Sequence, residues 1–117
     1  MLLVKTHIAA SSIAGTGLFA SEFIPKGTKI WHFEYLFDNK ISEYVFRKLP
    51  QIAKEYIINF CYMENGCYIL CTDNAKYTNH SLTPNCSDGF AISDIQEGEE
   101  ITENYYEYDE LASTKLK

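Results

Sequence analysis

Apolar residues in the first third of the chain occur in short runs separated by glycine and proline. The runs lie at residues 2–7, 17–20 and 29–34, and the third follows a Pro25-Lys26-Gly27 turn. Apolar runs of this length, bounded by turn residues, are typical of β-strands. The pattern therefore predicts an N-terminal part built from three short strands.

Between residues 41 and 62 the apolar residues recur every three or four positions, which is the spacing of one face of an α-helix. The residues with this spacing are Val45, Phe46, Leu49, Ile52, Tyr56 and Phe60. Ser42 is a suitable N-cap for a first helix, and Pro50 suits the first turn of a second, where its missing N–H has no cost. We predict a helical insert of two short helices that ends at the turn of residues 64–66.

The remainder of the chain returns to short apolar segments. Residues 67–72 and 90–95 are predicted strands, and residues 77–88 form a polar loop that contains Pro84. Gly98 opens a last turn before residues 99–108. Short strands around a small helical insert predict a single mostly-β domain with α+β character over residues 1–117.

Composition narrows the range of partners. The chain has 117 residues, of which 46% are hydrophobic and 22% charged, and its 16 acidic and 10 basic residues give a net charge of −6. This balance disfavours nucleic acid and anionic membranes and favours a basic protein partner. Residues 1–20 are interrupted by Lys5, His7, serines and glycines, so they do not resemble a signal peptide, and a cytoplasmic location is predicted.

The spacing of the four cysteines indicates neither a zinc site nor a disulfide framework. Cys61, Cys67, Cys71 and Cys86 follow the spacing C-x5-C-x3-C with the fourth fifteen residues later. Structural zinc sites usually present two close pairs, and small secreted domains carry more cysteines. We therefore predict free thiols and no metal, with a secreted or zinc-stabilised structural domain as the alternative.

Two loops carry unusual chemistry. Residues 15–20, GTGLFA, place two glycines around one residue, which lets a ligand approach the backbone closely, although such a pair is more often only a turn. Residues 79–85, NHSLTPN, gather many hydrogen-bonding side chains, although an Asx-rich turn has a similar composition. Asn79 and Asn85 also match the glycosylation sequon, which has little weight without a secretory signal.

The C-terminal third is strongly acidic. Residues 88–110 contain nine Asp or Glu residues and no Lys or Arg, with Tyr105, Tyr106 and Tyr108 among them. Most charge runs are only solvated surfaces. Tyrosines among acids nonetheless suit a cationic side chain, which is attracted by the carboxylates and by the ring faces.

In this order, the motifs resemble those of the SET-domain protein lysine methyltransferases, in particular small stand-alone bacterial and viral SET proteins. The resemblance covers residues 3–109 and rests on GTGLFA at 15–20, NHSLTPN at 79–85 and GEEITENY at 98–105. It implies a fold of small antiparallel sheets in which the C-terminal segment threads beneath the loop after Asn79, forming a pseudoknot, with the insert at about residues 41–62.

The resemblance also implies a cofactor, S-adenosylmethionine, whose product is S-adenosylhomocysteine. The implied cofactor-binding residues are Gly15, Thr16, Gly17, Leu18, Asn79, His80, and Tyr106 or Tyr108 over the adenine. The substrate lysine would enter from the opposite face, through a channel walled by Tyr62, Phe90 and Tyr105. Tyr105 matches the family's catalytic tyrosine; it would orient the amine, and its action as a base is left open.

The chain departs from zinc-dependent relatives at three places. Leu82 stands where those relatives carry a cysteine, and no cysteine follows Cys86, so the cysteine-rich post-SET tail is absent from this sequence, as is a pre-SET region. The segment from Cys86 to Phe90 is short, and Asp88 stands about where some relatives have tyrosine. Residues 107–117, or a second copy in a homodimer, would then close the channel.

We therefore expect methyl transfer to a lysine of a histone-like or other basic protein. The alternative is a catalytically silent SET module that binds a lysine-containing peptide or a partner protein. A protein of this kind from a pathogen or virus would be delivered to a host cell or its nucleus.

Overall fold

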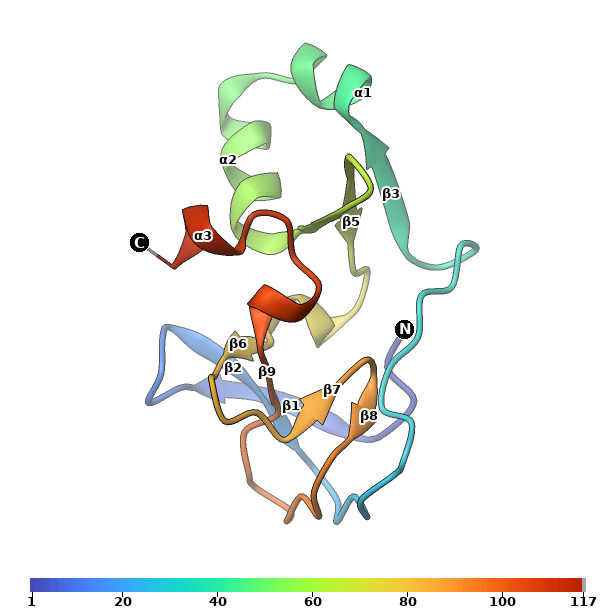
Figure 1. The fold of residues 1–117 in the computed structure, drawn as a ribbon, viewed down its shortest axis with the longest axis vertical. Helices are drawn as coiled ribbons and strands as arrows, with labels where there is room; N and C mark the ends of the chain where they lie inside the picture. Colours follow the sequence, from blue (N-terminus) through green and yellow to red (C-terminus); the bar gives the residue numbers. More distant parts are fainter. Residues whose placement is uncertain (117) are drawn as a thin grey trace.

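Several small sheets surround the C-terminal segment in the computed structural model, which describes residues 1–116 (Figure 1). Strands β1 (Thr6–Ala10) and β2 (Thr16–Ala20) form an antiparallel hairpin in which Ala9 pairs with Gly17. β2 buries Leu18 and Ala20, whereas β1 is mostly exposed. The predicted strand at residues 17–20 is confirmed, and the one predicted at 2–7 lies mostly before β1.

The third predicted strand, residues 29–34, is wrong as a strand. The segment makes only isolated bridges, Leu2 with Trp31 and Lys29 with Phe90. Its backbone groups serve two neighbours: the Ile30 carbonyl accepts from Leu3 N–H at 2.7 Å, and Ile30 N–H donates to the Gly89 carbonyl at 2.7 Å. Within residues 1–116, neither pairing continues along the segment, so no ladder forms on either side.

The helical insert is confirmed. β3 (Asn39–Ser42) leads into α1 (Glu43–Lys48), whose N-cap Ser42 accepts from Val45 N–H at 3.2 Å. Pro50 is the N-cap of α2 (Gln51–Phe60), one position before the helical turn in which it was predicted. β4 (Tyr62–Glu64) and β5 (Cys67–Leu70) complete a three-stranded sheet in the order β3-β5-β4.

The C-terminal half consists of two-residue strands and short turns. After the 3-10 helix η1 (Asn74–Tyr77), β6 (Asn79–His80) pairs in parallel with β9 (Thr102–Glu103), and β7 (Cys86–Ser87) pairs with β8 (Phe90–Ala91). The chain then forms the 3-10 helix η2 (Tyr105–Glu107) and α3 (Ala112–Lys115). The strand predicted at 90–95 is therefore shortened to β8, with an isolated bridge between Ile24 and Ile95.

The loop after β6 is hydrogen-bonded to the C-terminal segment through Ser81 near one end of the loop and Asn85 near the other. Ser81 N–H donates to the Glu103 carbonyl at 2.9 Å. The Asn85 side chain donates to the Glu100 carbonyl at 2.8 Å and accepts from Thr102 N–H at 2.9 Å. These contacts agree with the loop and segment expected in a pseudoknot; threading of one beneath the other stays a prediction.

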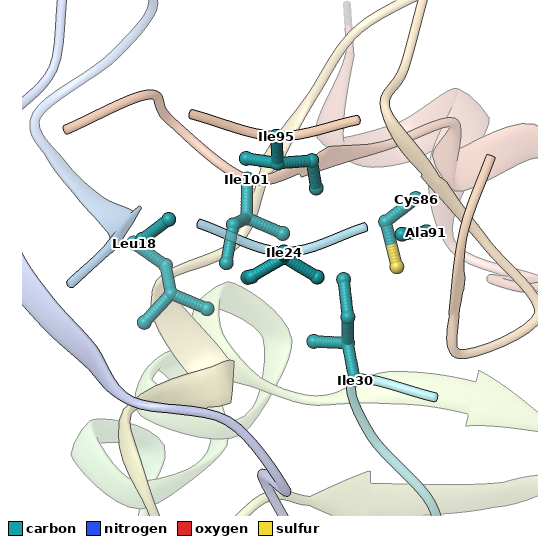
Figure 2. Packing of buried hydrophobic residues seen from close by; sticks show 8 residues of the cluster. Leu18, Ile24, Ile30, Cys86, Ala91, Ile95 and Ile101 are labelled. Carbon is teal, nitrogen blue, oxygen red and sulfur yellow. The ribbon is translucent and has the colours of Figure 1, made fainter. Parts of the chain in front are cut away.

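Two apolar clusters stabilise the two halves of the fold. Figure 2 shows the main cluster, in which the side chains point toward one another from well-separated parts of the sequence: Leu18, Ile24, Ile30, Cys86, Ala91, Ile95 and Ile101. A second cluster in the insert is centred on Ile57, Cys61 and Tyr68. All four cysteines are free thiols, and no helix within residues 1–116 has the length and apolar character to cross a membrane.

We expect Ile95→Ala to lower the free energy of unfolding by about 2–5 kcal/mol, because its side chain is fully buried and truncation leaves a cavity. Ile92→Ala is the matched control, since Ile92 is 44% exposed, and it should change stability by less than about 0.5 kcal/mol. Urea unfolding of both variants measures the difference. Equal losses would contradict the packing described for the main cluster.

Candidate active site

The β1–β2 turn is held against the third motif by one carboxylate. Glu100 accepts hydrogen bonds from the Ser11 hydroxyl at 2.7 Å and from the Asn79 side-chain amide at 2.9 Å. The same Asn79 amide donates to the Ala14 carbonyl at 3.0 Å. All three sequence motifs therefore meet at Asn79 and Glu100, a contact that the sequence analysis did not identify.

The two glycines of the first motif have different roles. Gly15 has a φ of +47°, and nothing lies within 4 Å of the position a Cβ would take, so its backbone faces open space. At Gly17 a Cβ would collide with the Glu100 carboxylate. Gly17 therefore allows the close approach of motifs one and three, and Gly15 leaves the turn open to a ligand.

Tyr105 is positioned by two hydrogen bonds. Its hydroxyl donates to the Thr78 carbonyl at 2.6 Å, and its backbone N–H donates to His80 Nδ1 at 3.1 Å. Because Nδ1 accepts, a neutral His80 carries its proton on Nε2. The His80 ring lies 5.3 Å from the Tyr105 ring and 5.6 Å from the ring of Tyr106, measured between centroids.

The Tyr105 hydroxyl remains protonated at neutral pH. Burial, together with the smaller effect of the carboxylates of Asp109, Glu103 and Glu100, raises the pKa of Tyr105 to about 12. A phenol of this kind donates a hydrogen bond and is a poor base in its phenol form. The structure therefore favours an orienting role for Tyr105 over the role of a base, which the sequence left open.

A cavity of about 540 Å³ opens between the N-terminal segments, the insert and the C-terminal segment. Its wall includes the aromatic residues Trp31, Phe33, Tyr62, Phe90 and Tyr108. Tyr105 lies outside this wall, in a smaller hollow of about 40 Å³ that shares Tyr62, Thr78 and Tyr108 with the cavity. The structure thus gathers Tyr62 and Phe90 as predicted and places Tyr105 one side chain away.

Two residues predicted to bind the cofactor, Leu18 and Tyr108, line the wall of the cavity. Leu18 is a core residue, with its side chain 1% exposed and its carbonyl bonded to Ile101 N–H at 2.8 Å. Tyr108 packs edge-on against Tyr62 at 5.2 Å within the cavity wall, alongside the predicted substrate residues. Tyr106 is 57% exposed beside His80, near the remaining predicted cofactor residues.

Four acidic residues also line the cavity: Glu64, Asp88, Glu103 and Glu107. Asp88 and Glu107 are exposed, whereas Glu103 is half-buried behind them and accepts a long hydrogen bond from the Cys86 thiol at 3.8 Å. The pKa of Glu103 is raised to about 7, mainly by burial. The hydrogen bond from Cys86 lowers this pKa, and repulsion from Glu107 and Asp88 raises it. Sequence analysis named Glu103 only as one acid among nine, because burial has no local sequence signal.

The charges around the cavity do not form a metal site. Within residues 1–116, no three His, Cys, Asp or Glu side chains lie together in a way that could hold a metal ion. Burial instead raises the pKa of Cys61 to about 11 and of Cys71 to about 12, so both stay as thiols at neutral pH.

Comparison with known proteins identifies the class. A family model described as the SET domain matches residues 15–106, so the chain belongs to the SET-domain family. The match spans all three motifs and the helical insert. No curated protein sequence matches the chain.

Solved structures share the fold. A Plasmodium falciparum protein proposed to be a histone methyltransferase is 22% identical, with a TM-score of 0.63 over 89% of this chain and 95% of that one. Polycomb Repressive Complex 2 from Chaetomium thermophilum, bound to S-adenosylmethionine, is 21% identical, with a TM-score of 0.70 over 97% of this chain. The present chain spans only 16% of that second protein.

The raised pKa of Glu103 predicts a pH-dependent loss of stability. Between its ordinary value of 4.5 and about 7, the folded state retains a proton that the unfolded state has lost. The free energy of unfolding should therefore fall by roughly 2–3 kcal/mol as pH rises through this window. Glu103→Gln should remove this part of the pH dependence.

Urea unfolding between pH 4.5 and 8 tests this, with Glu97→Gln as the control, because Glu97 is an exposed acid of the same segment. The Glu97 variant should follow wild type at every pH. If the free energy of unfolding of wild type and of Glu103→Gln changed with pH in the same way, the pKa of the Glu103 carboxyl would not be raised.

Proposed function

We propose that this protein transfers a methyl group from S-adenosylmethionine to the ε-amine of a lysine in a histone-like or other basic protein. The observation that carries the proposal is the position of Tyr105. Its ring lies against His80 of the second motif, and its hydroxyl, bonded to Thr78, reaches the hollow beside the acidic aromatic cavity. Membership of the SET-domain family supports this assignment.

The residues of the first two motifs suit S-adenosylmethionine. The exposed backbone of Gly15 and Thr16 faces open space beside the Asn79 amide, which would hold the methionine end of the cofactor together with Gly17. His80 would contact the adenine through its backbone. Tyr106 suits the adenine cover better than Tyr108, because Tyr106 is exposed beside His80. The cofactor supplies an electrophilic methyl group on a sulfonium.

The cavity suits a lysine side chain. Its aromatic wall matches the methylene stem and the ring faces attract an ammonium, while Asp88 and Glu107 are exposed at the cavity and would attract a basic segment. A lysine ammonium has no lone pair for attack. With an ordinary pKa near 10.4, its neutral form at pH 7.4 costs about 4 kcal/mol, which desolvation in such a cavity lowers.

The remaining task is alignment. Amine nitrogen, methyl carbon and sulfur must be nearly collinear with the reacting atoms about 3–3.5 Å apart, and positioning of this kind lowers barriers by several kcal/mol. Tyr105 would orient the amine through its hydroxyl oxygen, whose proton is committed to Thr78. We further propose a cytoplasmic or host-delivered protein that acts alone or as a homodimer.

Binding of the reaction product should test the cofactor site first. Isothermal titration with S-adenosylhomocysteine should give a saturable heat for wild type that Asn79→Ala weakens at least about tenfold, because it loses the amide beside Gly15 and Thr16. Gln51→Ala is the control, since Gln51 is an exposed α2 residue that lines neither the cavity nor the hollow. Absence of heat for wild type at millimolar ligand would contradict the cofactor assignment.

Tyr105→Phe should lower methyl transfer at least about tenfold while leaving affinity for S-adenosylhomocysteine largely unchanged, because only the hydroxyl is lost. Transfer is measured from methyl-labelled donor to core histones and to ribosomal proteins. Equal turnover by variant and wild type would remove Tyr105 from the mechanism. Product binding with no transfer to any basic protein would favour the silent peptide-binding module.

A further inference from the structure

The cavity contains a carboxylate that no cation within residues 1–116 balances. Glu103 lies in the cavity wall, and its charge contributes to raising the pKa of Tyr62, Tyr105 and Tyr108, each of which burial raises first. Glu103 and the phenols of Tyr62 and Tyr108 therefore belong to the same cavity wall. Among residues 1–116, none of the ion pairs includes it.

The other charges facing the cavity do not compensate Glu103. Glu64, Asp88 and Glu107 are exposed and add negative charge. Lys29 is exposed and directs its ammonium toward the Phe90 ring at 5.7 Å, and His32 lies 3.8 Å from Glu34. Lys29 and His32 are the basic side chains of the cavity wall within residues 1–116, and neither forms an ion pair with Glu103.

Such an arrangement fits one class of ligand. A half-buried carboxylate without a counter-ion is unfavourable, and the aromatic rings of the same cavity wall attract a cation through their faces. In the described chain, the indole N–H of Trp31, also in the cavity wall, is the one buried side-chain nitrogen or oxygen without a hydrogen-bond partner. An ammonium on an alkyl stem, carried by a peptide whose carbonyl reaches Trp31, satisfies all three groups.

We propose that Glu103 receives the ammonium of the substrate lysine and accepts one of its protons, so that the amine is neutral when it attacks. This inference rests on the proposed function and adds a proton acceptor to it. Desolvation disfavours two opposite charges in a closed site and favours the neutral acid and amine. A carboxyl whose pKa is already raised is a better acceptor than an ordinary carboxylate.

The step balances without a further reactant. One N–H proton of the lysine ammonium moves to a Glu103 oxygen, and its bonding pair becomes the nitrogen lone pair. That pair forms the new N–C bond to the sulfonium methyl group, and the S–C bonding pair stays on sulfur. The products are a methylammonium, a thioether and protonated Glu103, which returns its proton to water.

Binding of a simple ammonium tests the site without a protein substrate. The probe is n-butylammonium chloride, with n-butanol as the neutral control, and the signal is the fluorescence of Trp31, the single tryptophan of the chain, which lines the cavity. We expect saturable binding of n-butylammonium at pH 8 that is stronger than that of n-butanol. Glu103→Gln should weaken it at least about fivefold, and Glu97→Gln should leave it unchanged.

The pH dependence separates Glu103 from the other groups at the cavity. Butylammonium stays charged from pH 5.5 to 8.5, since alkyl ammonium groups titrate near 10.4. Wild-type affinity should fall as pH drops through about 7 and Glu103 is protonated, whereas any contribution of His32 would persist in Glu103→Gln. Equal affinity of wild type and Glu103→Gln, equal pH profiles, or no saturable binding would each overturn the proposal.

A transfer assay keeps this inference distinct from the proposed function. Glu103→Gln should bind S-adenosylhomocysteine as wild type does and transfer methyl to core histones at least about tenfold more slowly, with the loss largest near neutral pH. Unchanged transfer by this variant would overturn the role of Glu103 alone. Failure of wild type to bind S-adenosylhomocysteine would contradict the proposed methyltransferase function. The fluorescence titration with n-butylammonium would still decide whether Glu103 binds an ammonium.

Discussion

The structure depends on the hydrogen bonds between the loop of residues 79–87 and the segment of residues 100–105. The Asn85 side chain satisfies a carbonyl and an N–H of the acidic segment at once, and β6 pairs with β9 beside it. These groups are largely removed from water, so an unmade bond would leave a desolvated polar group, which costs about 1–3 kcal/mol. Cys86 of the loop and Ile101 of the segment both belong to the main apolar cluster. Packing and hydrogen bonding therefore support the same arrangement.

The pairing of β6 with β9 also positions the residues of the candidate active site. Tyr105 follows β9 directly, so the pairing that fixes β9 brings its backbone N–H to His80 and its hydroxyl to Thr78. On one side lie Asn79, Glu100 and the open turn at Gly15; on the other lie the cavity and Glu103. A single short strand pair thus separates a surface suited to a methyl donor from a surface suited to a lysine, with the tyrosine at the boundary.

Much of this was predictable from local pattern. The two helices of the insert follow from apolar spacing and from the cap at Ser42, because both signals act within a few residues. The three motifs pointed to Asn79, His80 and Tyr105 as site residues. The predicted strand at residues 29–34 failed because its partners in distant segments form only isolated bridges with it, and of the strand predicted at 90–95 only Phe90–Ala91 pairs as a strand. The residues predicted to bind the cofactor include Leu18, which is buried in the main apolar cluster, and Tyr108; both also line the cavity.

By itself, the sequence determined the family, the helical insert, the acidic character of the C-terminal third and the identity of the central tyrosine, because these depend on residue types and short spacings. Only the tertiary structure decided that Glu100 joins the three motifs, that Tyr108 faces the cavity and that Glu103 is half-buried in the cavity wall without a counter-ion among residues 1–116. The physical reason is that desolvation and charge compensation depend on residues distant in the chain, which a linear pattern does not record.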